Sequence, residues 1–223
     1  MCQINFWHDK VGSMLVEYTV VFPLFIAGTL GSVDVAYMLF DWALANKAAY
    51  VGARKAVVSN PVAPSITDNA ALGYPNPLTT PPGTLCFDLS TGLQNGKCPS
   101  TGQIVCTSTG CTPSTFGFDS TAFTNVSGTG VFDAMQRIFP RLQPANVTIT
   151  YQTIDKDTSG FASSGVVWQT GGPPLTVKVS ITGMTHRFFF IGSILRLFGG
   201  NIAAAPPMPA FSTTMQSEDM VTN

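Results

Sequence analysis

The sequence predicts an α+β protein: a long, partly transmembrane N-terminal helix, then a small antiparallel β-sheet domain with short helices and a disulfide-bearing loop. Three observations support this fold class. Nearly every residue from 14 to 40 is apolar, apolar residues alternate in short stretches near the C-terminus, and four of the five cysteines cluster between residues 86 and 111. The remainder is rich in Gly, Pro, Ser and Thr, which favours short strands and turns over a helical bundle.

The N-terminal helix is expected over residues 13–58, because Asn60 and Pro61 provide the first strong stop signal. At 1.5 Å per residue, its length would be roughly 65–70 Å, more than twice the thickness of a bilayer core. About residues 14–37 would span the membrane, and the rest would project and pack on another surface. We expect Pro23 to kink this helix and Asp34 to mark the far membrane interface.

Small residues recur every four positions in the second half of this helix. They form two rows, Ala45, Ala49 and Ala53 in one and Ala48, Gly52 and Ala56 in the other. Such rows let another backbone approach closely. They fit packing against other helices in a filament and docking on the chain's own domain equally well.

Residues 59–130 are interpreted as a Cys-containing loop region. Its four cysteines, Cys86, Cys98, Cys106 and Cys111, would form two disulfides outside the cytoplasm, with three possible pairings. We favour Cys86–Cys98 and Cys106–Cys111, because the intervening loops are short and turn-rich. A zinc site is disfavoured, since this region has neither a Cys-x-x-Cys motif nor a histidine.

Residues 131–223 are expected to form the α+β extracytoplasmic domain. The patterns predict a helix over 131–142 and strands over 147–151, 166–168, 177–181 and 211–215. The apolar run from Phe188 to Phe198 is too short to span a bilayer. We favour a core or sheet-covering helix there; an amphipathic element on the membrane or a filament wall is the alternative.

Composition and motifs argue against several function classes. Only 10% of the 223 residues are charged and the formal net charge is −1, so no basic patch indicates nucleic-acid binding. His186 has no recognisable nucleophile partner and is expected to be structural. The stretch from Asp155 to Gly160 resembles half of a calcium loop, but Val166 replaces the required glutamate, so a turn is favoured. We therefore expect no enzyme, cofactor, metal site or small-molecule substrate.

One carboxylate, Glu17, lies near the start of the apolar run, where burial of its charge would be costly. A cut after Gly12 would make Glu17 the fifth residue of the product, about one helical turn from the new amino terminus at Ser13. The cut-site context, Glu17 with Tyr18 beside it, and the helix ending in residues 46–54 resemble a class III prepilin signal. More narrowly, they resemble TadE-like minor pilins of the tight-adherence (Flp, type IVc) pilus system.

The resemblance implies that a membrane aspartyl prepilin peptidase removes the leader, residues 1–12, by cutting between Gly12 and Ser13. It also implies that Glu17, with Tyr18 in the same assembly motif, pairs with the amino terminus of a neighbouring subunit. The implied partners are other pilins and minor pilins, the peptidase and the pilus assembly platform. The implied location is the bacterial inner membrane, single-pass with an extracytoplasmic C-terminal domain, and incorporation into a surface pilus.

Two related functions remain open from the sequence. The Cys86–Cys111 loop could serve as a pilus-tip adhesin or surface-binding module. A type II secretion pseudopilin is the other alternative, disfavoured by Tyr18 directly after Glu17 and by the segment ending in Arg54.

Overall fold

The computed structural model describes residues 10–67, 103–153, 175–197 and 205–216. The chain divides into two compact units: Met1–Trp42 with Thr185–Pro207, and Ala43–Met184 with Met208–Asn223. Helix α1 (Lys10–Val58) contributes residues to both. The predicted fold class is confirmed, since this long apolar helix precedes an antiparallel five-stranded sheet with short helices and a disulfide.

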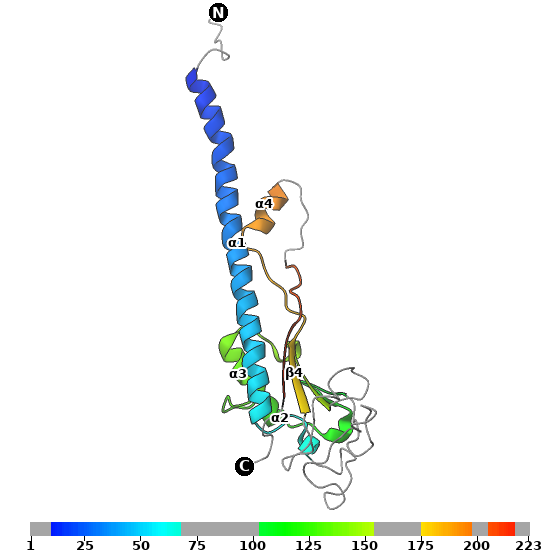
Figure 1. The fold of residues 1–223 in the computed structure, drawn as a ribbon. Coiled ribbons are helices and arrows are strands. Elements are labelled where there is room, and N and C mark those ends of the chain that lie inside the picture. Colours follow the sequence, from blue (N-terminus) through cyan, green and yellow to red (C-terminus); the bar gives the residue numbers. More distant parts are fainter. Residues whose placement is uncertain (1–9, 68–102, 154–174, 198–204, 217–223) are drawn as a thin grey trace, which may run out of the picture. The chain divides into compact units, whose positions relative to one another are not determined.

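The first unit contains the apolar half of α1 and the short helix α4 (Ile191–Leu197) (Figure 1). Helix α1 continues through Pro23 and begins at Lys10, three residues before the expected start. Large apolar side chains between residues 16 and 42 are exposed, from 38% at Ile26 to 68% at Tyr18. A helix that exposes apolar groups in this way is suited to lipid or to other helices rather than to water.

Helix α4 corrects one expectation from the sequence. We favoured a core or sheet-covering helix over residues 188–198, but α4 belongs to the first unit and contacts the apolar half of α1. Its first turn lies against Asp34 and Gly31. The helix is also shorter than the apolar run that predicted it.

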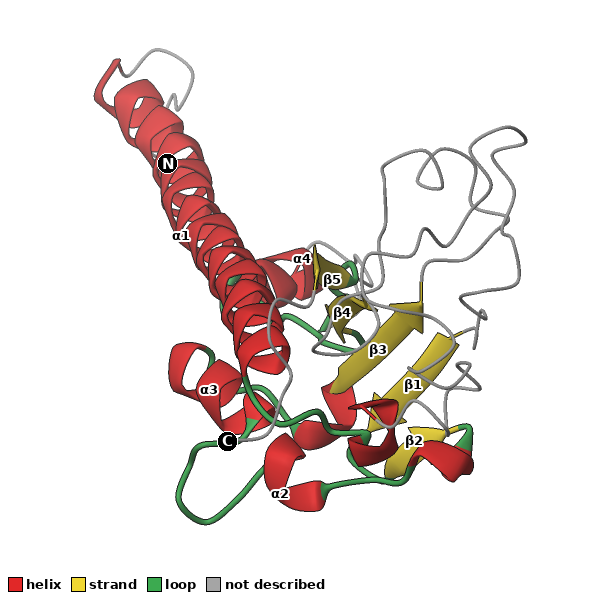
Figure 2. Ribbon diagram, turned by 60° about the horizontal axis from the view of Figure 1, so that its bottom comes forward, coloured by secondary structure: helices red, strands yellow, loops and turns green. Residues whose placement is uncertain are grey.

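The second unit is built around a sheet with strand order β2-β1-β3-β4-β5, in which all pairs are antiparallel (Figure 2). The strands are β1 (Gln103–Thr107), β2 (Gly110–Thr112), β3 (Val147–Thr153), β4 (Leu175–Ile181) and β5 (Phe211–Gln216). Ile149 pairs with Val179 and Tyr151 with Val177, and all four side chains are completely buried. The alternation of apolar residues thus predicted β3 and β4 correctly, and the final strand expected at 211–215 is β5.

Short helices complete the second unit. They are η1 (Pro64–Thr67), η2 (Ser114–Phe116), α2 (Ser120–Phe123), α3 (Val131–Ile138) and η3 (Pro144–Asn146). Helix α3 ends at Ile138, before the predicted Leu142, because Phe139 precedes Pro140 and leaves the helical region with φ −128°.

The small-residue rows of α1 are buried in the core of the second unit. Ala45, Ala48 and Ala53 are fully buried, and Gly52 faces Met135 of α3 so closely that a Cβ there would lie 2.5 Å from the Met135 sulfur. Docking on the chain's own domain therefore explains these rows, and they are not free for another helix.

The interpretation of residues 59–130 as a loop region needs correction. Residues 103–130 contain β1, β2, η2 and α2, and Ile104 and Cys106 are buried in the core. The structure contains the favoured Cys106–Cys111 disulfide, with an S–S distance of 2.01 Å, across the paired strands β1 and β2. Cys86 and Cys98, the expected strand at 166–168 and the motif from Asp155 to Gly160 lie outside the described residues.

Candidate functional site

The predicted processing and assembly residues lie on the first turns of α1. Gly12 and Ser13 are within the helix, and Glu17 and Tyr18 are exposed. The Tyr18 ring stacks on Phe22 one turn later, with ring centroids 5.6 Å apart. No described residue forms an ion pair with Glu17, so within this part of the chain its carboxylate is available to a partner.

A second carboxylate of the apolar helix, Asp34, is completely buried. It accepts three hydrogen bonds from backbone N–H groups at the start of α4: from Phe189 at 3.1 Å, Phe190 at 2.8 Å and Ile191 at 2.7 Å. The free N–H groups of a helix start and a carboxylate satisfy each other in this arrangement. Sequence analysis placed Asp34 at a membrane interface but missed this partner, which lies about 155 positions later.

A buried histidine and aspartate form a second polar contact in the first unit. His186 Nδ1 lies 3.0 Å from Asp41 Oδ2, and the His186 side chain is 2% exposed. The backbone N–H of His186 donates to the carbonyl of Pro206, and Thr185 bridges to Pro207. These contacts hold His186 in place, and its Nε2 is buried with no hydrogen-bond partner among the described residues.

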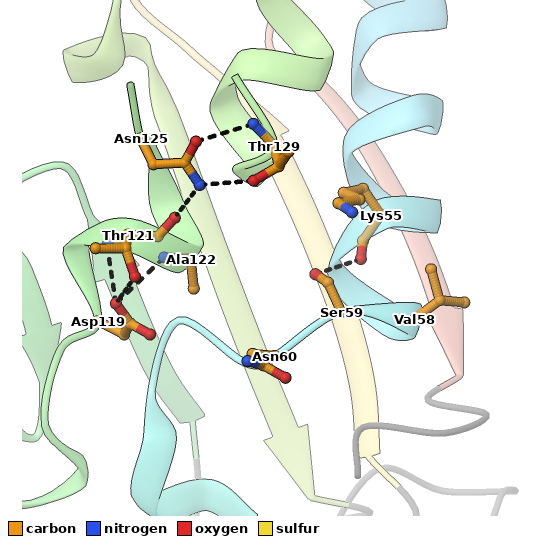
Figure 3. Close-up of a pocket in the computed structure, with 9 residues that line it drawn as sticks. All are labelled: Lys55, Val58, Ser59, Asn60, Asp119, Thr121, Ala122, Asn125 and Thr129. Carbon is orange, nitrogen blue, oxygen red and sulfur yellow. Dashed lines mark hydrogen bonds between the residues drawn. The ribbon is translucent and has the colours of Figure 1, made fainter. Parts of the chain in front are cut away.

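The second unit has a polar pocket of about 340 Å³ at the C-terminal end of α1 (Figure 3). Its lining residues are Lys55, Val58, Ser59, Asn60, Asp119, Thr121, Ala122, Asn125 and Thr129. Most of their polar groups bond to one another. Asn125, for example, bonds to Thr129 through both its amide nitrogen and its carbonyl oxygen, at 2.8 and 3.0 Å. These hydrogen bonds fix the positions of the residues that line the pocket. The sequence analysis did not predict this pocket.

Two titratable groups of the second unit have shifted pKa values. The hydroxyl of Thr121 and the backbone N–H groups of Thr121 and Ala122 donate to Asp119 and hold its pKa below the usual value, against the effect of burial. Burial raises the pKa of Tyr151, whose hydroxyl oxygen accepts a hydrogen bond from the backbone of Val62 at 3.0 Å.

The described residues contain no cluster of three or more histidine, cysteine, aspartate or glutamate side chains that could hold a metal ion. In its apolar half, α1 thus has one exposed acid near its start, Glu17, and one acid further along that is satisfied by hydrogen bonds, Asp34.

Helix α1 is long and apolar enough to cross a membrane. It contains a stretch of 18 residues that is strongly apolar, and almost none of that stretch is buried among the described residues. A core helix of a water-soluble domain would be mostly buried. The low burial therefore favours a membrane anchor.

Comparison with known proteins adds independent evidence on the same segment. The model of the family described as TadE-like protein matches residues 12–54. No curated protein and no solved structure matches the chain. The matched range begins at Gly12 and covers Glu17, Tyr18 and most of α1. Residues 12–54 are therefore similar to TadE-like proteins, and the resemblance predicted from the sequence is confirmed over this segment.

Proposed function

We propose that this chain is a minor pilin or pseudopilin, anchored in the bacterial inner membrane, that takes part in assembly of a tight-adherence pilus by packing of its N-terminal helix. The proposal rests on two properties of the same segment: its match to a family model and its exposed apolar side chains. The segment that matches the TadE-like family includes residues 16–42, whose large apolar side chains are left exposed by the described part of the chain. The chain acts by association with other subunits and carries out no catalysis.

The chemistry of assembly would depend on two groups. Cleavage after Gly12 frees the amino group of Ser13, and Glu17 then lies about one turn away along the helix. In hydrocarbon, an unpaired ammonium or carboxylate is costly, whereas a correctly placed pair recovers that cost. Pairing between Glu17 of one subunit and Ser13 of the next would therefore favour a single axial register. The exposure of Glu17 supports this role.

The topology follows from the same proposal. The amino terminus would lie in the cytoplasm, where the leader is removed, and the second unit with its disulfide would lie outside, where disulfides persist. The partners would be other pilins, the prepilin peptidase and the assembly platform.

The direct test is the mass of the N-terminal peptide of the chain recovered from membrane fractions, together with pilus counts in a strain lacking the gene. We expect the peptide to begin at Ser13, and we expect pili to be lost and restored by the wild-type gene. A mature protein that retains residues 1–12, or normal pili in the deletion strain, would contradict the proposal.

A further inference from the structure

We propose that Phe188–Leu197 is a second membrane-contacting element, which lies at the boundary where α1 leaves the bilayer and is held there by Asp34. The inference rests on the proposed anchoring of α1 and assigns a lipid partner to a segment that the TadE-like match does not cover.

The depth of α4 along α1 gives the first argument. Asp34 is 18 residues beyond Val16, which at 1.5 Å per residue is about 27 Å, close to the thickness of a hydrocarbon core. Ile191 packs near Gly31, where an added Cβ would lie 3.9 Å from its side chain. The Phe189 ring meets Tyr37 edge-on, with centroids 5.9 Å apart. The start of α4 therefore lies beside residues 31–37 of α1 (Figure 1). By the length estimate above, this is the depth of the membrane boundary.

The polar groups in this contact give the second argument. In apolar surroundings, an unpaired carboxylate and the free N–H groups of a helix start would each cost several kcal/mol. The structure brings them together: all three bonds to Asp34 are 3.1 Å or shorter, and the carboxylate is completely buried. In water, neither group would require the other. The pairing lets the first turn of α4 lie in hydrocarbon without an unsatisfied polar group.

The exposed surface gives the third argument. Tyr37, Phe40, Phe189 and Phe190 form an aromatic group that we call the collar, with exposed fractions of 52%, 59%, 65% and 38%. The collar continues the exposed apolar surface of α1, and aromatic side chains concentrate where a membrane meets water.

Two exposed arginines flank this segment, Arg187 before the collar phenylalanines and Arg196 near the end of α4. Long basic side chains reach from apolar surroundings toward lipid headgroups. The combination of aromatic and basic groups fits a lipid surface better than a second copy of the chain, in which the apolar collar would have to find a matching apolar patch.

The experiment places the photocrosslinker benzoyl-phenylalanine at position 189 of the full chain in membrane vesicles and detects lipid adducts by mass spectrometry after illumination. Position 24 on α1, where Leu24 is 60% exposed, reports on membrane insertion. Position 126 in the second unit, where Val126 is fully exposed, is the negative control. We expect lipid adducts at 189 and 24 and none at 126.

The outcomes separate this inference from the proposed function. Lipid adducts at 24 but none at 189, or a protein adduct at 189 instead, would overturn the inference and leave the anchor intact. Absence of lipid adducts at 24 would overturn the anchor and the inference together.

The role of Asp34 is tested in the same assay. We expect Asp34→Ala to reduce the lipid adduct at 189 several-fold and to leave the adduct at 24 unchanged. Ser32→Ala is the matched control, because Ser32 is exposed and bonds only within its own helix, to the carbonyl of Thr29. An unchanged adduct at 189 in Asp34→Ala would show that Asp34 does not hold the segment. The Cys106–Cys111 disulfide, followed by peptide mass, reports on correct folding of each variant.

Discussion

At the scale of single residues, two of the three acids of α1, Glu17 and Asp34, have opposite environments. Glu17 is exposed and has no ion-pair partner among the described residues, whereas Asp34 is buried and accepts three backbone hydrogen bonds. An acid in an apolar helix must be paired or reach water. The charge of Asp34 is satisfied by hydrogen bonds within the chain. The charge of Glu17 is not, so in apolar surroundings Glu17 needs a partner from another subunit.

Replacement of this acid should therefore affect assembly rather than processing. We expect Glu17→Ala to be cleaved normally and to enter pili at least ten-fold less than wild type, because the amino terminus of the neighbouring subunit would lose its partner. The measurement is an immunoblot of sheared pili against membrane fractions. Thr29→Ala is the control, since Thr29 is exposed on the same helix and its hydroxyl donates to the carbonyl of Ile26 within that helix. Wild-type incorporation of Glu17→Ala would contradict the pairing.

Gly12 tests the processing step by itself. A peptidase has to bring the backbone at the cut site against its carboxylates, and a branched side chain there would block the approach. We expect Gly12→Val to accumulate as the full-length species, seen as the slower band on a gel. Gly28→Val is the matched control, because Gly28 lies in the same helix and an added Cβ would meet no atom within 4 Å. A mature band of normal mobility in Gly12→Val would exclude this cut site.

At the scale of elements, the carboxylate of Asp119 caps the start of α2 and holds one side of the polar pocket in place. Asp119 accepts hydrogen bonds from the N–H groups of Thr121 and Ala122 at 2.8 and 3.2 Å. We expect Asp119→Ala to lower the free energy of unfolding by about 1 kcal/mol at neutral pH, as for other N-cap replacements.

The pH dependence of this difference has a definite sign. The pKa of Asp119 is lowered on folding from an ordinary value of 3.8, so its contribution is present above that value and disappears as the pH falls through the lower folded pKa. Urea unfolding of the detergent-solubilised chain at pH 7 and below pH 3 measures this. Asp119→Asn is the control, since it keeps an acceptor oxygen but cannot titrate. An equal difference between wild type and Asp119→Ala at both pH values would contradict the assignment.

The elements also show what the sequence could and could not predict. Local patterns were sufficient for α1, which starts with a long apolar stretch, and for β3 and β4, where apolar residues alternate, and a last strand was also expected at 211–215, where β5 lies. Strands β1 and β2 were missed because they have only 5 and 3 residues and lie among glycines, threonines and cysteines typical of loops. The contact between Asp34 and the start of α4 was missed because no local pattern reports a partner about 155 positions away.

At the scale of the whole molecule, the two halves of α1 differ in how much of their apolar surface is buried. The half in the second unit packs into the hydrophobic core, where its alanines are buried. The half in the first unit keeps its apolar side chains exposed. The continuous apolar surface that α1 leaves exposed for filament or membrane contacts therefore lies before position 43, whereas the later half exposes single residues such as Tyr50.

The same division indicates how to distinguish a role in assembly from a role in adhesion. Removal of residues 85–102 leaves β1 and β2 intact, because β1 begins at Gln103, and it removes Cys86 and Cys98 together so that no unpaired partner of that pair remains. If the chain acts through its N-terminal helix, this deletion should leave piliation within about two-fold of wild type, whereas Glu17→Ala should not. Electron-microscopic pilus counts and a surface-attachment assay on the same strains provide the measurement. Wild-type pili with lost attachment would assign an adhesive role to the deleted segment, and lost pili would show that assembly depends on that segment as well as on the helix.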